Sequence, residues 1–135
     1  MRANTQLTGM TGVYLVAAEL SKRGFIVSLT SRSARGADLL VTNQSCTKTF
    51  AVQVKTNATT FGFWLFGQHA KKMKARALIY VLVNLRRDQT EFFVMPSATV
   101  ARGICTSRKK RSTWYFHMRE DALPYQNKWG IFGKP

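Results

Sequence analysis

The sequence predicts an α/β (α+β) fold, in which helices flank a mixed central β-sheet. Short runs rich in β-branched and aromatic residues recur at 25–30, 49–56 and 78–85, as is typical of strands. A helical spacing of apolar residues precedes them near the N-terminus. The expected order is helix, three strands, helix, two strands, helix and strand. The 135 residues fit one domain, expected to span 1–135.

In the N-terminal half, the first helix is expected to start at Thr8 or Thr11 and to run to Arg23. Gly24 follows it as a typical helix stop. The apolar stripe of this helix comprises Met10, Val13, Tyr14, Ala17 and Leu20. Strands are expected at 25–30, 37–42 and 49–56, joined by a basic loop at 31–36 and a turn at 43–48.

In the C-terminal half, segment 57–67 is expected to be an aromatic-rich loop, and 68–76 a short basic helix. The most apolar run, 78–85, predicts a central strand covered on both faces. The other expected elements are a strand at 91–95, a helix from Pro96 and Ser97 to about 105, a basic loop at 108–111 and a strand at 114–118. The tail after it carries enough apolar side chains to dock on the core: Tyr125, Trp129, Ile131 and Phe132.

The charge is strongly one-sided, with 21 Lys and Arg against 6 Asp and Glu, a formal net charge of +15. This excess favours an acidic partner, with nucleic acid first and an anionic membrane surface second. No apolar run approaches the ~20 residues that span a membrane. Cys46 and Cys105 lie far apart and lack the spacing of a zinc site with His69 and His117, so a reducing cytoplasm is the expected location.

Asp38 is one of only six acidic residues, and it lies beside apolar side chains in an expected strand. Burying a carboxylate without a partner is costly, so a partner is expected nearby. A symmetric hairpin centred between Ser45 and Cys46 pairs Asp38 with Gln53 and makes Lys55 a diagonal neighbour on the same face. The same register pairs Leu40 with Ala51 and Thr42 with Thr49.

This polar set suits metal-assisted cleavage of phosphodiester bonds. The Asp38 carboxylate, the Gln53 amide oxygen and the Val54 backbone carbonyl are hard oxygen ligands of the kind that Mg²⁺ (or Mn²⁺) prefers. Lys55 could position the attacking water or stabilise the developing negative charge. The structural alternative is a half-buried ion pair between Asp38 and Lys55, with Gln53 as a hydrogen-bond partner.

Three stretches of the sequence together resemble the PD-(D/E)xK nuclease superfamily. They are GADLL at 36–40, FAVQVKT at 50–56 and, ending the first helix, SKRGF at 21–25. The layout is most similar to archaeal Holliday-junction resolvases and related small nuclease-like proteins, and the close match covers about residues 9–56. The resemblance implies a restriction-endonuclease-like fold and a metal-dependent endonuclease that acts on duplex or branched DNA.

Residue by residue, the resemblance makes Asp38 the metal-binding aspartate, Gln53 the (D/E) position and Lys55 the catalytic lysine. Glutamine at that position resembles Mrr-type restriction nucleases. The resolvases also carry a metal-binding Glu early in the first helix, and its spacing from the Gly-Phe pair falls here on Val13. Glu19 is a weak candidate for the missing ligand, because it lies about 240° further around the helix and its spacing favours ion pairs with Lys22 and Arg23.

Three groups of basic residues are candidates for contacts with nucleic-acid phosphates. They are Arg32 and Arg35; Lys71, Lys72, Lys74 and Arg76; and Arg108, Lys109, Lys110 and Arg111. The alternatives to an active nuclease are a nuclease-like domain that only binds DNA, and a basic RNA-binding accessory protein. A homodimer would supply the two active sites that cutting both strands needs. The aromatic residues of 61–66 either stack on bases or pack beneath a loop.

Overall fold

The N-terminal helix sets the geometry of one face of the molecule. The computed structural model describes residues 4–31, 36–86 and 88–135. Helix α1 (Thr5–Lys22) begins earlier than expected because Asn4, not a threonine, caps it: its side-chain oxygen accepts from the backbone N–H groups of Gln6 and Leu7 at 3.0 and 3.3 Å. At the other end, Gly24 adopts a positive φ of 99°, which completes the expected stop.

The central sheet is mixed, as the sequence predicts. Its strands lie in the order β1-β2-β3-β5-β6. Their bounds are Ile26–Leu29 for β1, Leu39–Thr42 for β2, Thr49–Asn57 for β3, Leu78–Asn84 for β5 and Glu91–Pro96 for β6. Strands β3 and β5 are parallel, whereas the other neighbours are antiparallel. Every residue of β5 is buried, as expected of a central strand covered on both faces.

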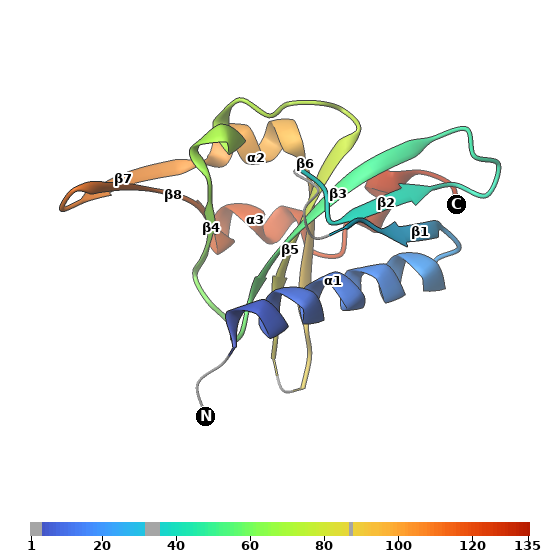
Figure 1. Cartoon of the computed structure of the whole chain (residues 1–135), viewed down its shortest axis with the longest axis horizontal. Coiled ribbons are helices and arrows are strands. Elements are labelled where there is room, and N and C mark those ends of the chain that lie inside the picture. Colours follow the sequence, from blue (N-terminus) through green and yellow to red (C-terminus); the bar gives the residue numbers. More distant parts are fainter. Residues whose placement is uncertain (1–3, 32–35, 87) are drawn as a thin grey trace.

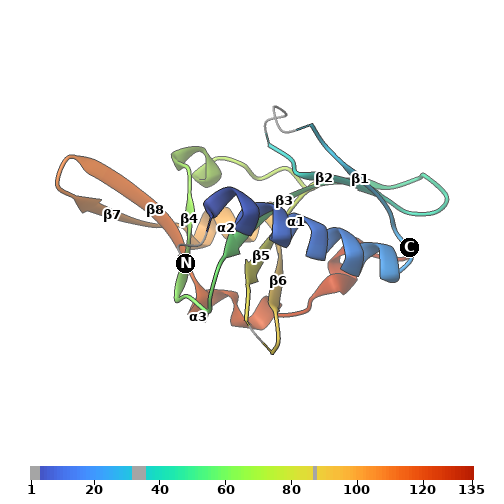
Figure 2. The same ribbon diagram turned by 60° about the horizontal axis from the view of Figure 1, so that its bottom comes forward.

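The two faces of this sheet are covered by different layers (Figures 1 and 2). Helix α1 and the C-terminal turn η3 (Trp129–Phe132) cover one face, and the buried Trp129 and Phe132 join the core there, as expected of the tail. Helix α2 (Ser97–Gly103) lies on the other face, with a second sheet in the order β4-β8-β7. The bounds of that sheet are Phe63–Phe66 for β4, Ser112–Met118 for β8 and Cys105–Lys109 for β7.

Several expectations for the C-terminal half are wrong. Segment 57–67 is not only a loop, because residues 63–66 form β4 and pair with β8. The basic segment 108–111 ends β7 and turns into β8 at Lys110 and Arg111, so it forms the tip of a β-hairpin. Segment 68–76 contains only the 3₁₀ turn η1 (Gln68–Lys71), and two further turns follow β8: α3 (Arg119–Ala122) and η2 (Leu123–Tyr125). None of the described helices is long and apolar enough to cross a membrane.

Candidate functional site

The register between β2 and β3 is the predicted one. Leu40 pairs with Ala51 and Thr42 with Thr49. Just before β2, the backbone N–H of Asp38 donates to the Val52 carbonyl at 2.8 Å. Because Leu39 is the register partner of Val52, Asp38 and Leu39 both lie opposite Val52, as in a β-bulge, and the predicted pairing of Asp38 with Gln53 is wrong.

The Asp38 carboxylate bends onto the edge of β3. Its Oδ2 accepts a hydrogen bond from the backbone N–H of Val54 at 2.8 Å. The N–H and C=O groups of one strand residue point to the same edge, so the Val54 carbonyl also lies on the Asp38 side. Charge-assisted bonds of this kind hold a carboxylate in one orientation.

Gln53 and Lys55 lie on the face of β3 opposite α1. The Gln53 Oε1 atom is buried and has no hydrogen-bond partner, which is costly for an amide oxygen unless something else binds it. The Lys55 ammonium lies 5.3 Å from the centre of the Phe66 ring. Burial lowers the pKa of Lys55, and the negative charge of Asp38 opposes part of that change.

Asp38 and Lys55 are therefore electrostatically coupled, but no ion pair within 4.0 Å joins these two described residues. The structural alternative, an ion pair with Gln53 as its hydrogen-bond partner, does not account for either group: the Gln53 oxygen is unpartnered, and the ammonium lies over an aromatic ring.

Tyr80 is a further neighbour, which no motif in the sequence indicates. It pairs with Gln53 across the parallel β3–β5 ladder, and its ring lies 5.3 Å from that of Phe66. Its hydroxyl is buried without a hydrogen-bond partner, and burial raises its pKa. The pairing of β5 with β3, which joins residues 27 positions apart in the sequence, brings Tyr80 to this cluster.

Helix α1 approaches β3 most closely at Gly12. A Cβ atom on Gly12 would lie 1.8 Å from Oγ1 of Thr56, so only glycine allows this contact. The next residue, Val13, lines a shallow pocket of about 330 Å³ together with Asp38 and Val54. The rest of its lining comes from the first half of α1: Thr5, Gln6, Gly9 and Met10.

Val13 thus lies beside Asp38, where the resemblance places a helix acid, and its side chain is only 7% exposed within the apolar core. Glu19 does not line this pocket. Its carboxylate forms ion pairs with Lys22 at 3.1 Å and Arg23 at 3.5 Å, which confirms the ion-pair interpretation. The structure gives the alternative metal role of Glu19 no support.

The oxygen atoms at this site fit a hard divalent cation. Asp38 supplies a carboxylate and Val54 a carbonyl on the same strand edge, whereas Gln53, next along β3, offers a buried oxygen without a partner but does not line the Asp38 pocket. Only one of these groups carries a negative charge. Across the described ranges, no cluster of three or more His, Cys, Asp or Glu side chains gathers that could hold a metal ion. The donor set is therefore of the right type but weakly charged.

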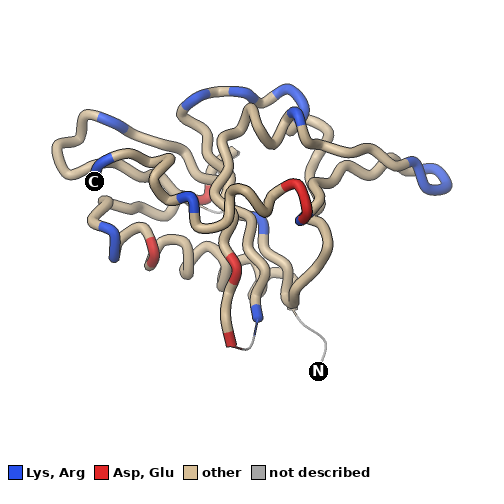
Figure 3. The backbone as a smooth tube through the Cα atoms, turned by 180° about the vertical axis from the view of Figure 1, so that it is seen from behind, with Lys and Arg blue, Asp and Glu red and all other residues tan. Residues whose placement is uncertain are grey.

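The basic groups occupy separate places on the molecule (Figure 3). Lys71, Lys72, Lys74 and Arg76 are exposed on the segment before β5, and the Lys71 ammonium lies 5.3 Å from the Tyr115 ring. Residues 108–111 form the exposed tip of the β7–β8 hairpin, which projects from the body (Figure 1). Arg32 and Arg35 lie outside the described residues.

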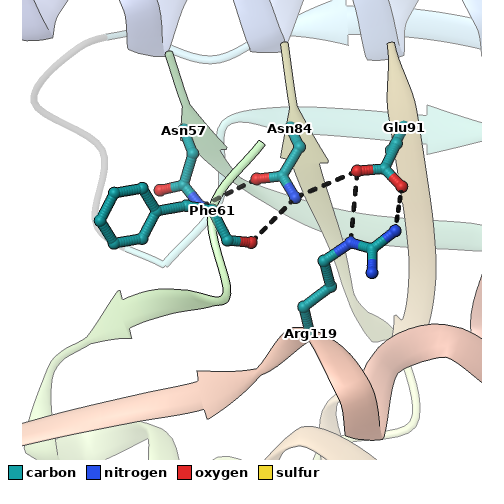
Figure 4. Close-up of polar contacts among 5 residues, drawn as sticks. All are labelled: Asn57, Phe61, Asn84, Glu91 and Arg119. Carbon is teal, nitrogen blue, oxygen red and sulfur yellow. Dashed lines mark hydrogen bonds and ion pairs between the residues drawn. The ribbon is translucent and has the colours of Figure 1, made fainter. Parts of the chain in front are cut away.

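A polar row fixes the chain that leaves β3 (Figure 4). Asn57, Asn84 and Glu91 are register partners across β3, β5 and β6. Asn57 donates to the Asn84 side chain at 2.9 Å, and Asn84 donates to Glu91 at 3.3 Å. Arg119 donates to both Glu91 oxygens, at 3.3 and 2.5 Å. The amide groups of Asn57 and Asn84 also donate to the carbonyls of Phe63 and Phe61, which ties the β3–β4 segment to the sheet.

No protein-family model matches this sequence, and a search of curated proteins finds no match. Solved structures do match. One is the bacterial homing endonuclease I-Ssp6803I, with a TM-score of 0.62, 16% identity, and coverage of 96% of this chain and 91% of that one. The chain has the restriction-endonuclease-like fold.

A second match to this fold is Hjc, a Holliday junction resolvase of the archaeal hyperthermophile Archaeoglobus fulgidus. Its TM-score is 0.57 with 16% identity, over 94% of this chain and 97% of that one. The restriction-endonuclease-like fold implied by the resemblance over about residues 9–56 is confirmed over nearly the whole chain. At this identity the likeness extends to the fold alone.

Proposed function

We propose that this chain is a metal-dependent endonuclease that hydrolyses phosphodiester bonds in duplex or branched DNA. The observation that carries the proposal is the buried Gln53 oxygen without a partner, on the same face of β3 as Lys55 and next along the strand to the Val54 N–H that binds Asp38. A structural polar cluster would satisfy that oxygen from within the protein. A cation-binding site leaves it free for its ligand.

Each residue then has a distinct role. Asp38 and Gln53, with the Val54 carbonyl, hold Mg²⁺ or Mn²⁺. The bound cation would polarise the scissile phosphate and lower the pKa of a water molecule. The Val54 N–H fixes the orientation of the Asp38 carboxylate. Lys55, whose pKa burial lowers, positions the attacking water and stabilises the negative charge that develops on the phosphate.

Cleavage of supercoiled and branched DNA with Mg²⁺ or Mn²⁺ tests this proposal. Wild-type protein should cut, and Asp38→Asn, Gln53→Ala and Lys55→Ala should each lower the rate by about 100-fold or more. Lys128→Ala removes an exposed lysine elsewhere and serves as the control for lost charge. Equal rates in wild type and Lys55→Ala would exclude Lys55 from the chemistry and contradict the proposed site.

The second candidate function is DNA binding without turnover, and Val13 favours it. An apolar side chain beside Asp38 leaves a single carboxylate for the cation. Salt-dependent DNA binding with no cleavage in either metal would support this candidate. Preferential binding of RNA over duplex DNA would instead favour the RNA-binding alternative.

A further inference from the structure

We propose that a groove beside the start of α1 binds an unpaired nucleobase of the DNA substrate; this inference rests on the proposed function. The groove holds about 450 Å³, which is within the range of about 300–1,000 Å³ typical of small-ligand sites. Its apolar wall is formed by Phe61, Phe63, Leu65 and Trp114. The lining also includes polar groups of Thr5, Thr8 and Asn57.

The apolar wall is unusually open to solvent. Phe61 is 50% exposed, Leu65 53% and Trp114 44%, although they come from three different segments. The alternation along β4 explains this: Trp64 and Phe66 fill the core, so Phe63 and Leu65 must point outward. Phe61 contacts Phe63 edge-on, with ring centres 5.2 Å apart. Large exposed apolar side chains gathered in one place mark a binding surface rather than a chance arrangement.

Charge complementarity identifies the occupant as nucleic acid. Trp114 belongs to β8, and the β7–β8 tip a few residues away carries Arg108, Lys109, Lys110 and Arg111. All four are exposed, and none forms an ion pair within the described part of the chain. Proteins recognise single-stranded nucleic acid with two components: cations that contact the phosphates, and aromatic side chains that stack on the bases. The threonine hydroxyls and the side-chain oxygen of Asn57 can bond the edge of an unpaired base, since the Asn57 amide N–H groups already donate to Phe63 and Asn84.

The groove adjoins the candidate active site. Thr5 lines both this groove and the pocket that contains Asp38 and Val13. A base held in the groove would therefore belong to a nucleotide close to the scissile phosphate. Hydrogen bonds from the side chains of Asn57 and Asn84 to the carbonyls of Phe63 and Phe61 hold these two residues in place. The apolar wall is therefore formed before DNA binds. The preferred substrate is then a branched, flapped or bulged duplex rather than a fully paired one.

Fluorescence and affinity measurements in EDTA test this inference without cleavage. Trp114 is exposed, whereas Trp64 and Trp129 are buried at 1% and 5%, so quenching by DNA reports mainly on the groove. Affinity is measured for a duplex with one bulged nucleotide and for its fully paired counterpart. The variants are Trp114→Ala and Phe61→Ala. Tyr14→Ala is the matched control, because Tyr14 is an aromatic residue that is 57% exposed on α1 and does not line the groove.

Wild-type protein should prefer the bulged duplex, and Trp114→Ala should lower that affinity about tenfold, the loss expected from one stacked base. Its affinity for the paired duplex should change less than twofold, and Tyr14→Ala should change neither. Equal affinity of the wild type for both duplexes, or equal losses on both with Trp114→Ala, would overturn the inference. Metal-dependent cleavage without a bulge preference would leave the proposed function standing. A bulge preference that depends on Trp114, without cleavage, would overturn the proposed activity alone.

Discussion

Lys55 is held where its charge is unfavourable. Burial lowers the pKa of its ammonium from 10.5, and Asp38 offsets only part of that change. The pKa of Lys55 is lower in the folded than in the unfolded state. The charged group therefore lowers the free energy of unfolding, and this cost is complete at pH values below the folded pKa. This cost is relieved as the pH rises towards 10.5. A lysine pKa lowered in this way is typical of groups at functional sites, in accord with the role proposed for Lys55.

Lys55→Met should therefore stabilise the protein while abolishing cleavage. Methionine keeps the length of the side chain and its contact with Phe66 but removes the charge. Denaturant unfolding should show a higher free energy of unfolding for the variant near neutral pH, and the difference should shrink as the pH rises towards 10.5. A destabilised variant would show that Asp38 compensates the charge fully.

Val13→Glu should strengthen metal binding, because a second carboxylate would adjoin Asp38 in the same pocket. Without metal the variant should be less stable than wild type, since the position is 7% exposed. Thermal melting with and without Mg²⁺ measures both effects. Mg²⁺ should raise the melting temperature more for Val13→Glu than for wild type or for Val13→Gln. An equal drop with and without Mg²⁺ would assign position 13 to the core alone.

At the scale of elements, the row of Asn57, Asn84 and Glu91 joins three strands to α3. Hydrogen bonds from Arg119 lower the pKa of Glu91, and those from Asn84 contribute. The ion pair is only partly sheltered, because the Glu91 side chain is 5% exposed and that of Arg119 30%. Its loss should therefore cost less than the loss of a fully buried pair.

Glu91→Gln should lower the free energy of unfolding by about 2 kcal/mol at neutral pH, within the range for hydrogen bonds to charged groups. A folded pKa below the ordinary 4.5 means that the Glu91 contribution is present above that pH and is lost as the pH falls through the folded value. Urea unfolding of both proteins should show the difference shrinking in acid. A difference that stays constant down to pH values well below 4.5 would contradict this assignment.

The elements of the central sheet could be predicted because their side chains alternate or are wholly apolar. Strand β4 was missed because its outward face carries Phe63 and Leu65, so no polar alternation marks it. Strand β7 was missed for the opposite reason: its side chains are mostly exposed, and only backbone pairing with β8 defines it. Its turn uses Lys110 at a positive φ of 56°, where glycine or asparagine would have signalled a hairpin.

The candidate site likewise has one part that could be predicted from the sequence and another that could not. Gln53 and Lys55 share one face of β3, and the short 43–48 turn brings this strand beside Asp38, so their neighbourhood could be predicted, whereas the bulge that sets Asp38 opposite Val52 could not. Tyr80 and the aromatic groove depend on contacts between distant segments, which the sequence does not order in space. Val13 was located by its spacing from Gly24, and the structure places it beside Asp38.

At the scale of the whole molecule, the net charge of +15 should make DNA binding steeply salt-dependent. If the four hairpin cations each contact a phosphate, raising the salt from about 50 to 200 mM should lower the affinity roughly 100-fold. Lys109→Ala with Lys110→Ala should reduce the slope of log affinity against log salt by about 2. Lys128→Ala should leave the slope nearly unchanged, and a salt-independent affinity in wild type would contradict phosphate recognition.

Helix α1 contacts the rest of the fold closely at two glycines, and these contacts fix its position. Gly24 ends the helix beside Gln44, whose side chain donates to its carbonyl, and Gly12 contacts Thr56 about 18 Å away along the axis. Between these anchors the helix can neither slide nor turn. One residue inserted or deleted there would rotate the Val13 side by about 100° relative to the Gly24 end. The distance from β1 to the Asp38 pocket therefore depends on the number of residues between Gly12 and Gly24. Natural variants should differ in this interval by substitutions and not by insertions or deletions.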